Sequence, residues 1–262
     1  ELEKISNGSF YPLKGFMNEE NFKSVVNEMR LTNGKLFPIP VLLPITNNLI
    51  KQVKKNEILY LIHKKKMVGS MVVKSIFKVN FNNYLHKLFN TKDIKHPGFK
   101  MLSEKGETFI GGPIISFFVH KNKYTSIASS PEKIKKKIKR LGLKKIAAFQ
   151  TRNVPHKAHE FILDLALDKI GALFIQPLIG KKKKGDFHPD AVLNSYKYLL
   201  KNHFPKNKVI LGALTTNMRY AGPREALFHA IIRKNYGCTH FLVGRDHALS
   251  LIHISEPTRR YS

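Results

Sequence analysis

Polar side chains that can bind an anion are concentrated in residues 150–160, QTRNVPHKAHE. His156 and His159 are three positions apart, so on a helix they would share one face of a turn and could donate to the same phosphate group. Arg152 adds a planar guanidinium fork that suits an oxyanion. These residue types at this spacing predict a nucleotide phosphate site.

A buried strand and a helix are needed to position these side chains. The apolar run 144–149 has the length of a strand, and apolar residues recur at helical spacing over 161–170. We expect the helix to begin near Pro155, because proline has no N–H to leave unpaired at a first helical position. The free N–H groups and dipole of that helix end favour an anion. Gln150 and Asn153 would then lie at the strand end, the usual ligand edge of a parallel sheet.

The histidine pair has two other interpretations. It could be half of a zinc site, although the metalloprotease helix carries its histidines four apart with a glutamate between them. It could also be two ordinary surface histidines beside a helix end. Both interpretations are kept as alternatives to the anion site.

A second polar segment, GRDH at residues 244–247, follows a strand-like apolar run at 241–243. The glycine permits close backbone approach to a ligand, and the arginine and histidine are donors. The aspartate can orient either donor or accept a hydrogen bond from a ribose hydroxyl. This segment is therefore expected at a second carboxyl edge.

A third segment is the loop 217–225, NMRYAGPRE, which leads into an expected helix over 226–235. Its proline and glutamate are helix-start signals, so part of the segment is a helix cap. Arg219 and Arg224 are either anion ligands or structural partners.

Arginine usage singles out the same segments. Only nine of the 46 Lys and Arg residues are arginines, so this chain uses lysine wherever a positive charge suffices. The remaining arginines should need the geometry of the guanidinium fork. Four of the nine, Arg152, Arg219, Arg224 and Arg245, lie in the three segments.

In this order and spacing the segments closely resemble the ATP sulfurylase (sulfate adenylyltransferase) family. The motifs of the catalytic part are residues 150–153 with His156 and His159, residues 218–226, and residues 243–248. Further similar motifs are residues 7–17, 96–98, 111–114 and 180–187.

The resemblance implies a reaction and a set of site residues. A sulfate oxygen would attack the α-phosphorus of ATP, which enters with Mg²⁺, to give adenosine 5′-phosphosulfate and pyrophosphate. The implied catalytic residues are Thr151, Arg152 and Asn153, and the implied sulfate ligands are Gln150, Arg152 and Ala248. The implied ATP ligands are Gln150, Thr151, Arg152, Asn153, His156, His159, Gly244, Arg245, Asp246 and His247. No metal-ligand set is expected in the protein, and the family is commonly homo-oligomeric.

The expected fold class is α/β with two domains. Short β-like runs at 36–43, 57–62, 67–73 and 108–110 precede a basic helix at 131–141. Residues 1–135 would form a small β-rich, barrel-like (PUA-like) domain. Residues 136–248 would form a Rossmann-like parallel-sheet nucleotidyltransferase domain that is C-terminally incomplete. Residues 249–262 resemble a translated adaptor sequence, so we expect a truncated enzyme with a non-native tail.

The composition suggests the main alternative function. A net charge of +28 suggests a basic nucleic-acid-binding module, but the lysines are spread along the chain, and the run 181–184 is expected to be a solvated loop. A nucleotidyltransferase acting on another acceptor is a further alternative. The single cysteine, Cys238, is expected to be an inert buried thiol. One cysteine cannot form an intrachain disulfide, which suggests a reducing cytoplasm. The sequence contains no run of about 18 apolar residues, the length expected of a membrane span.

Overall fold

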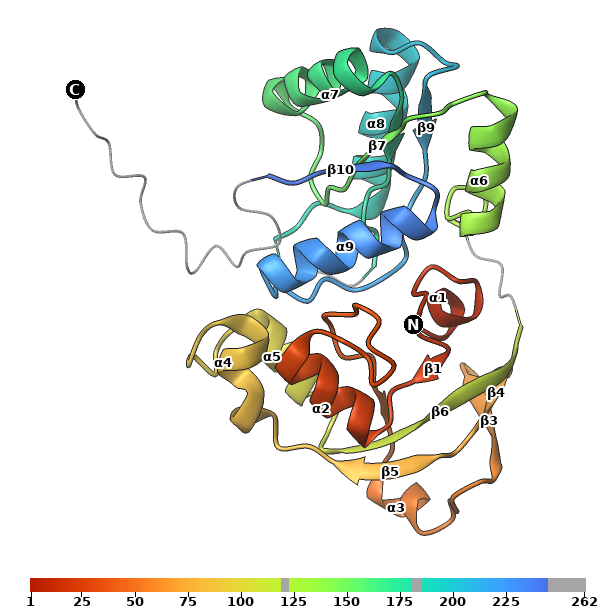
Figure 1. Cartoon of the computed structure of the whole chain (residues 1–262), viewed down its shortest axis with the longest axis vertical. Coiled ribbons are helices and arrows are strands. Elements are labelled where there is room, and N and C mark those ends of the chain that lie inside the picture. Colours follow the sequence, from red (N-terminus) through yellow and green to blue (C-terminus); the bar gives the residue numbers. More distant parts are fainter. Residues whose placement is uncertain (119–122, 181–184, 245–262) are drawn as a thin grey trace, which may run out of the picture.

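Two β-sheets form the framework of the chain (Figure 1). The computed structural model describes residues 1–118, 123–180 and 185–244. Strands β1 to β6 build one sheet and strands β7 to β10 build the other. The division expected between residues 135 and 136 stays a prediction, and that position falls within helix α6 (Pro131–Arg140).

The first sheet is antiparallel and is organised around one long strand, β6. Its strands are β1 (Gly15–Phe16), β2 (Leu43–Pro44), β3 (Ile58–His63), β4 (Lys66–Val72), β5 (Ser75–Lys78) and β6 (Thr108–Phe117). Strand β6 pairs with β1, β2, β4 and β5, whereas β3 pairs with β4. This part of the chain is therefore β-rich, as predicted.

One predicted strand is wrong. Residues 36–42 belong to no strand, and only an isolated bridge joins Leu36 to Arg30. Pro38 and Pro40 lack the N–H groups that a ladder needs, so this apolar run is buried as an extended loop instead.

Short helices surround the first sheet. They are α1 (Leu2–Ser6), α2 (Glu19–Glu28), α3 (Asn47–Ile50), the 3₁₀ turn η1 (Phe81–Tyr84), α4 (Leu85–Phe89) and α5 (Pro97–Ser103). Helix α2 buries Phe22, whose ring packs at 6.2 Å from Phe77 and 6.3 Å from Phe81. This aromatic group anchors α2 on the sheet.

The second sheet is parallel throughout. Its strands are β7 (Ala147–Phe149), β8 (Leu173–Ile175), β9 (Val209–Leu211) and β10 (His240–Leu242), in the spatial order β10-β7-β8-β9. Each strand is only three residues long, and the central strands β7 and β8 consist of buried apolar residues. All carboxyl ends therefore meet at one edge, as the sequence predicted.

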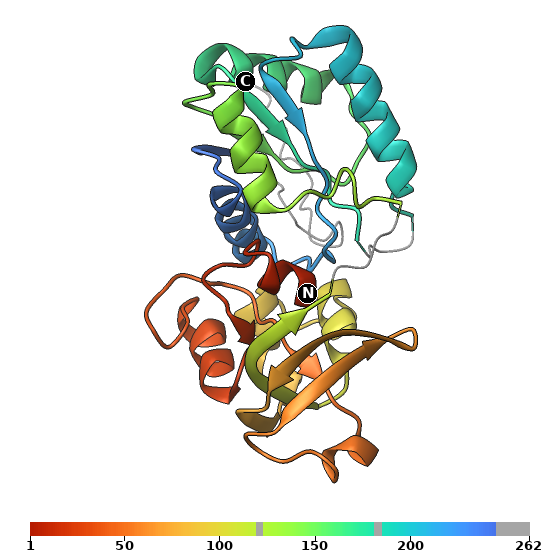
Figure 2. The same cartoon turned by 90° about the vertical axis from the view of Figure 1, so that its right-hand side faces the viewer.

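Helices cover both faces of the parallel sheet. Ala147 and Phe149 belong to the core beneath α7 (Lys157–Ile170) and α8 (Pro189–His203). Ala148, between them, belongs to the core that includes α6 and α9 (Pro223–Asn235). This alternation is the period of two of a strand buried on both faces. Figure 2 shows the sheet between α6 and α8.

The helix starts differ in detail from expectation. Helix α7 begins at Lys157, because His156 has the extended backbone of an N-cap, and Pro155 lies in the preceding loop. Helix α9 begins at Pro223, a first helical position of the kind proline favours. None of the helices in the described ranges is long and apolar enough to cross a membrane.

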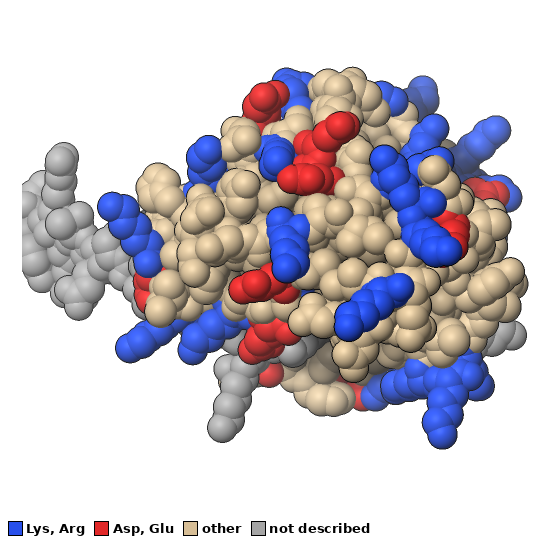
Figure 3. Space-filling view, turned by 90° about the horizontal axis from the view of Figure 1, so that it is seen from below, with Lys and Arg blue, Asp and Glu red and all other residues tan. Residues whose placement is uncertain are grey.

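Basic side chains are distributed rather than gathered on the face drawn in Figure 3. Lys and Arg side chains project there at separate points, and Asp and Glu lie between several of them. The run 181–184 lies outside the described residues. On this face, the charge of the chain forms no continuous basic patch.

Candidate functional site

The two main polar segments begin side by side at the carboxyl edge of the parallel sheet. Phe149, the last residue of β7, pairs with Leu242, the last residue of β10. The loop from Gln150 and the loop through Gly244 therefore leave neighbouring strands at the same level. This confirms that both lie at the edge where open parallel sheets bind ligands.

Part of the second segment falls outside the described ranges. Arg245, Asp246, His247 and Ala248 all lie there, so their predicted roles stay predictions. Gly244 is exposed, and a Cβ added to it would meet nothing within 4 Å. Among the described residues, packing does not require glycine at this position, and the backbone approach to a ligand stays a prediction.

A tight turn follows β7. The Thr151 hydroxyl accepts the N–H of Asn153 at 3.1 Å and donates to the Asn153 carbonyl at 3.2 Å. The Thr151 carbonyl accepts the N–H of Leu178 at 2.8 Å, which ties the turn to the segment after β8. Thr151 is buried, whereas Gln150 and Arg152 are half-buried and Asn153 is exposed. Thr151 therefore shapes the turn, and the side chains on either side of it lie nearer the surface.

His156 and His159 form a stacked pair at the N-terminus of α7. Their ring centroids are 3.8 Å apart and their planes differ by 25°. The carbonyl of His156 accepts the N–H groups of His159 at 2.8 Å and Glu160 at 3.1 Å, so the pair spans the first turn. Phe149 supports the inner ring, with its centroid 5.2 Å from that of His159. The expected shared face is confirmed.

The pKa of His159 lies below its ordinary value. Partial burial is the largest cause, and the neighbouring His156 adds repulsion between the protonated rings. Two imidazolium rings in contact would repel each other unless an anion lay beside them. A phosphate group beside the pair would offset this repulsion.

The zinc alternative requires further ligands. Within the described residues, no group of three or more His, Cys, Asp or Glu side chains is placed to hold a metal ion.

Arg152 lies over an aromatic ring. Its guanidinium carbon is 5.3 Å from the ring centroid of Tyr220, which is within the range of a cation–π contact. Tyr220 is buried, and its hydroxyl donates to the Asp186 carboxylate at 3.5 Å. The loop before α9 thus reaches the first polar segment through Tyr220.

The two arginines of that loop have structural partners. The Arg224 guanidinium donates to the carbonyls of Val25 at 3.1 Å, Val26 at 2.8 Å and Pro38 at 3.2 Å. Arg219 donates to the Glu1 carboxylate at 2.7 Å. It also donates to the Thr216 hydroxyl and the Asn217 carbonyl. Of the two interpretations left open, the structural one fits both side chains.

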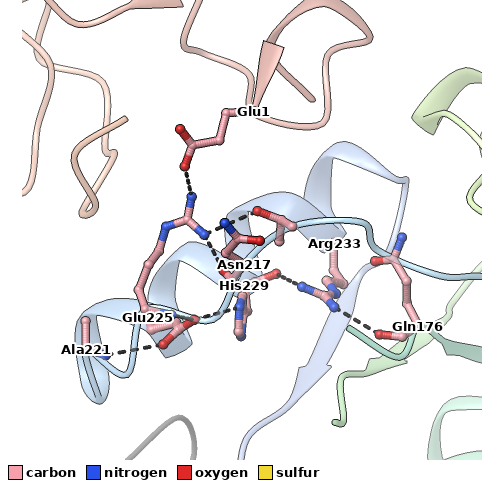
Figure 4. Close-up of polar contacts among 9 residues, drawn as sticks. Glu1, Gln176, Asn217, Ala221, Glu225, His229 and Arg233 are labelled. Atoms are coloured by element: carbon pink, nitrogen blue, oxygen red, sulfur yellow. Dashed lines mark hydrogen bonds and ion pairs between the residues drawn. The ribbon is translucent and has the colours of Figure 1, made fainter. Parts of the chain in front are cut away.

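A buried carboxylate shapes the same loop (Figure 4). Glu225 accepts the N–H of Arg219 at 2.9 Å and the N–H of Ala221 at 3.2 Å through its two oxygens. Its Oε1 also lies 3.4 Å from Nε2 of the buried His229. Burial raises the pKa of the Glu225 carboxyl, while the backbone N–H groups act in the opposite direction. Glu225 therefore fixes the backbone on both sides of Tyr220.

A motif of the N-terminal half supports this loop from the other side. A Cβ at Gly98, in α5, would overlap the carbonyl oxygen of Arg219. Only glycine permits this approach, which explains the glycine of the segment 96–98.

Sequence reasoning missed two residues of this region. Tyr220 was passed over because a tyrosine in a loop gives no periodic signal. Gln176 follows β8 directly and is fully buried at the edge where β7 ends, and its carbonyl accepts from Arg233 at 3.1 Å. The sequence signal for Gln176 was a polar residue directly after the strand-like apolar run 173–175. Cys238 is buried with its pKa raised to about 12 by burial, which agrees with the inert thiol predicted.

Comparison with known proteins places this geometry in a family. Residues 125–251 match the ATP-sulfurylase family model, and residues 1–117 match the PUA-like domain model. A sulfate adenylyltransferase of Persephonella marina is 40% identical over 252 residues, which are 95% of this chain and 65% of that protein. The chain belongs to the ATP-sulfurylase family. It spans about 65% of the length of such relatives.

Other family members give the same picture. The sulfate adenylyltransferase of Pyrococcus abyssi is 38% identical over 248 residues, and that of Trichodesmium erythraeum is 38% identical over 250 residues. These alignments cover 95% of this chain and 65% and 64% of the two relatives. The predicted family is therefore confirmed, as is the fold of a PUA-like domain followed by a parallel-sheet domain.

A solved structure shares the fold. The chain described as a hexameric APS kinase from Thiobacillus denitrificans superposes with a TM-score of 0.73 at 22% identity. The match covers 93% of this chain and 45% of that chain.

Proposed function

We propose that the whole protein is a sulfate adenylyltransferase, transferring the adenylyl group of ATP to sulfate or catalysing the reverse reaction. One observation carries this proposal. The stacked pair His156 and His159 and the guanidinium of Arg152 lie around the start of one helix, beside the loop that follows β10. The relatives named sulfate adenylyltransferase support the same activity.

The chemistry needs little from the protein besides charge and alignment. A sulfate oxygen attacks the α-phosphorus of ATP while the bond to the bridging oxygen of the β-phosphate breaks, so pyrophosphate leaves and no proton is transferred. Both reactants are anions, so neutralising repulsion and holding the attack in line supply most of the rate. Mg²⁺ enters as part of the ATP substrate, where it binds phosphate oxygens.

We assign the sulfate to the first loop. Gln150 and Arg152 would hold it, together with the backbone of Ala248. The turn of Thr151, Arg152 and Asn153 would place the nucleophilic oxygen on the α-phosphorus. Arg152 suits this task because its five N–H donors lie in one plane and match the oxygens of an oxyanion.

The remaining residues would hold the nucleotide. His156 and His159 would donate to the phosphates and stabilise charge on the departing pyrophosphate. Residues 244–247 would contact the nucleoside, with Asp246 accepting from the ribose and Arg245 and His247 donating. Each of the segments after β7 and β10 would therefore contact both substrates.

We further propose that the protein acts in the cytoplasm as a homo-oligomer. The single cysteine and the hexameric state of the structural relative support this proposal. Size-exclusion chromatography with light scattering measures the oligomeric state, and a monomer at micromolar concentration would contradict it.

The first test is ATP formation from adenosine 5′-phosphosulfate and pyrophosphate. The Arg152→Ala variant should be slower by about 10²–10³-fold, the usual cost of removing one preorganised donor to a developing charge. Because the chain spans 65% of its relatives' length, the assay is run on these 262 residues and on a form extended to that length.

Arg140→Ala is the matched control, since Arg140 is exposed at the end of α6. That variant should keep the wild-type rate. Wild-type turnover that survives Arg152→Ala would refute the role of the turn. Competition by selenate or molybdate with sulfate separates this activity from transfer to another acceptor. Tight, salt-sensitive RNA binding that is indifferent to Arg152 would instead favour the nucleic-acid alternative.

A further inference from the structure

Tyr220 connects three segments that lie far apart in the sequence. Its ring lies 5.3 Å from the guanidinium carbon of Arg152, and its hydroxyl donates to Asp186 at 3.5 Å. Only 1% of Tyr220 is exposed, and the ring packs with Leu178 and Met218 in a small core of its own. The tyrosine is thus a fixed platform beneath a half-buried arginine.

The backbone of Tyr220 is held in an unusual conformation. Its φ of 57° is in the left-handed region, which is costly for a bulky side chain. Glu225 compensates by accepting the N–H groups of Arg219 and Ala221, the residues on either side. A conformation that the surrounding structure enforces in this way commonly marks a functional position.

We propose that Tyr220 is a positioning residue that holds the guanidinium of Arg152 in place for the sulfate, an inference that rests on the proposed function. A cation–π contact holds a guanidinium through its charge and uses none of its N–H donors. A carboxylate in the same place would occupy those N–H groups and cancel the charge that the sulfate needs. The contact with Tyr220 therefore holds Arg152 without using the donors that bind an oxyanion.

The proposal separates the ring of Tyr220 from its hydroxyl. Tyr220→Phe keeps the ring and should leave the KM for sulfate within about twofold of wild type, because the contact with Arg152 uses the ring face. Tyr220→Leu and Tyr220→Asn remove the ring and should raise that KM by about tenfold, the scale of one cation–π contact in a desolvated site. Asparagine tolerates the left-handed region, so one of these two variants tests the ring even where the other fails to fold.

A nuclear magnetic resonance signal reports the contact independently of activity. The Nε–H resonance of Arg152 is identified by its disappearance in Arg152→Lys, and its chemical shift should be changed by the ring current of Tyr220. That change in chemical shift should persist in Tyr220→Phe and vanish in Tyr220→Leu or Tyr220→Asn. Tyr236→Leu is the matched control, because it removes a different buried tyrosine ring and should change neither the signal nor the KM.

Two outcomes overturn the proposal. The first is a Tyr220→Leu or Tyr220→Asn protein that folds and keeps both the wild-type KM and the displaced Arg152 signal. The second is a rise in the KM for sulfate that is equally large in Tyr220→Phe and Tyr236→Leu. This would show that the KM responds to a general loss of packing and not to the contact between the Tyr220 ring and Arg152. If the extended wild type makes no ATP, the proposed function fails, while the Arg152 signal still decides whether Tyr220 holds that side chain.

Discussion

Three arginines of this chain use the same guanidinium group for different purposes. Arg152 lies over the ring of Tyr220 beside the candidate anion site. Arg224 donates to three backbone carbonyls. Arg233 is fully buried, and burial lowers its pKa to about 10 while it donates to the carbonyl of Gln176. In a lysine-rich chain, retention of arginine indicates a need for the fork, and in Arg224 and Arg233 the fork binds backbone carbonyls.

The protonation of His159 gives a prediction at the same scale. Because burial lowers its pKa, the unfolded chain binds a proton more readily, and stability should fall as the pH drops below about 6.5. Between pH 7 and pH 5, wild type should lose more unfolding free energy than His159→Gln, as measured by urea unfolding at each pH. Equal losses would contradict the lowered pKa.

Bound pyrophosphate should raise the pKa of His159, opposite to the effect of burial. An anion at the histidine pair favours the imidazolium, so the pKa of His159 should rise when pyrophosphate is added, as followed by proton–nitrogen spectra. His203 is exposed and hydrogen-bonded to Asp164, so it serves as the reference histidine whose titration should not respond.

At the scale of elements, a side chain at the start of α9 binds backbone carbonyls at the end of α2. Helix α2 ends at Met29 in the left-handed conformation, and its late carbonyls belong to residues such as Val25 and Val26. Arg224, in the first turn of α9, donates to both carbonyls and also to Pro38 in the proline-containing loop. The Val25 carbonyl also accepts the N–H of Met29 at 3.0 Å, so Arg224 adds a second donor there and reinforces the end of α2.

Arg224→Lys should lower the unfolding free energy by about 1–3 kcal/mol, because an ammonium cannot span three carbonyls and leaves buried acceptors unsatisfied. Circular dichroism during denaturant unfolding measures the loss. Arg140→Lys, at an exposed position, is the control and should change stability by less than about 0.5 kcal/mol. An equally small loss at Arg224 would show that the three contacts contribute nothing.

At the scale of the whole molecule, α9 joins the two sheets. Phe228 on α9 is fully buried, with its ring 5.0 Å from that of Phe10 and 5.5 Å from that of Phe37. The same core continues to Phe174 of the parallel sheet and Phe109 of the antiparallel sheet. Figure 1 shows α9 between the two halves, so one continuous core fixes how they sit on each other.

Phe228→Ala should lower the unfolding free energy by about 3–5 kcal/mol, through lost burial and the cavity that remains. It should also separate one unfolding transition into two, because the halves lose their shared contact. The chain contains no Trp, so a tryptophan introduced in either half reports that half alone. Tyr198→Ala is the control, since Tyr198 is 74% exposed. Persistence of one transition in Phe228→Ala would assign the coupling to other contacts.

The sequence by itself determined the local features of this protein. The apolar run 144–149, the polar turn and the amphipathic segment after it specify a strand, a loop and a helix from short-range chemistry alone. His156 and His159 meet as the N-cap and the third residue of one helix, a local relation that needed no tertiary information. Pro38 and Pro40 show the limit, since an apolar run suggested a strand that the missing N–H groups forbid.

Only the tertiary structure decided which distant groups meet. Nothing in the spacing of Arg152 and Tyr220 places the guanidinium over the ring, because that contact depends on how α9 docks against the parallel sheet. The packing of α9 on the N-terminal half brings Arg224 to the end of α2, where sequence reasoning left ligand and structural roles open. The physical reason is that backbone propensity and periodicity act over a few residues, whereas burial and hydrogen-bond satisfaction are settled only when the two halves pack together.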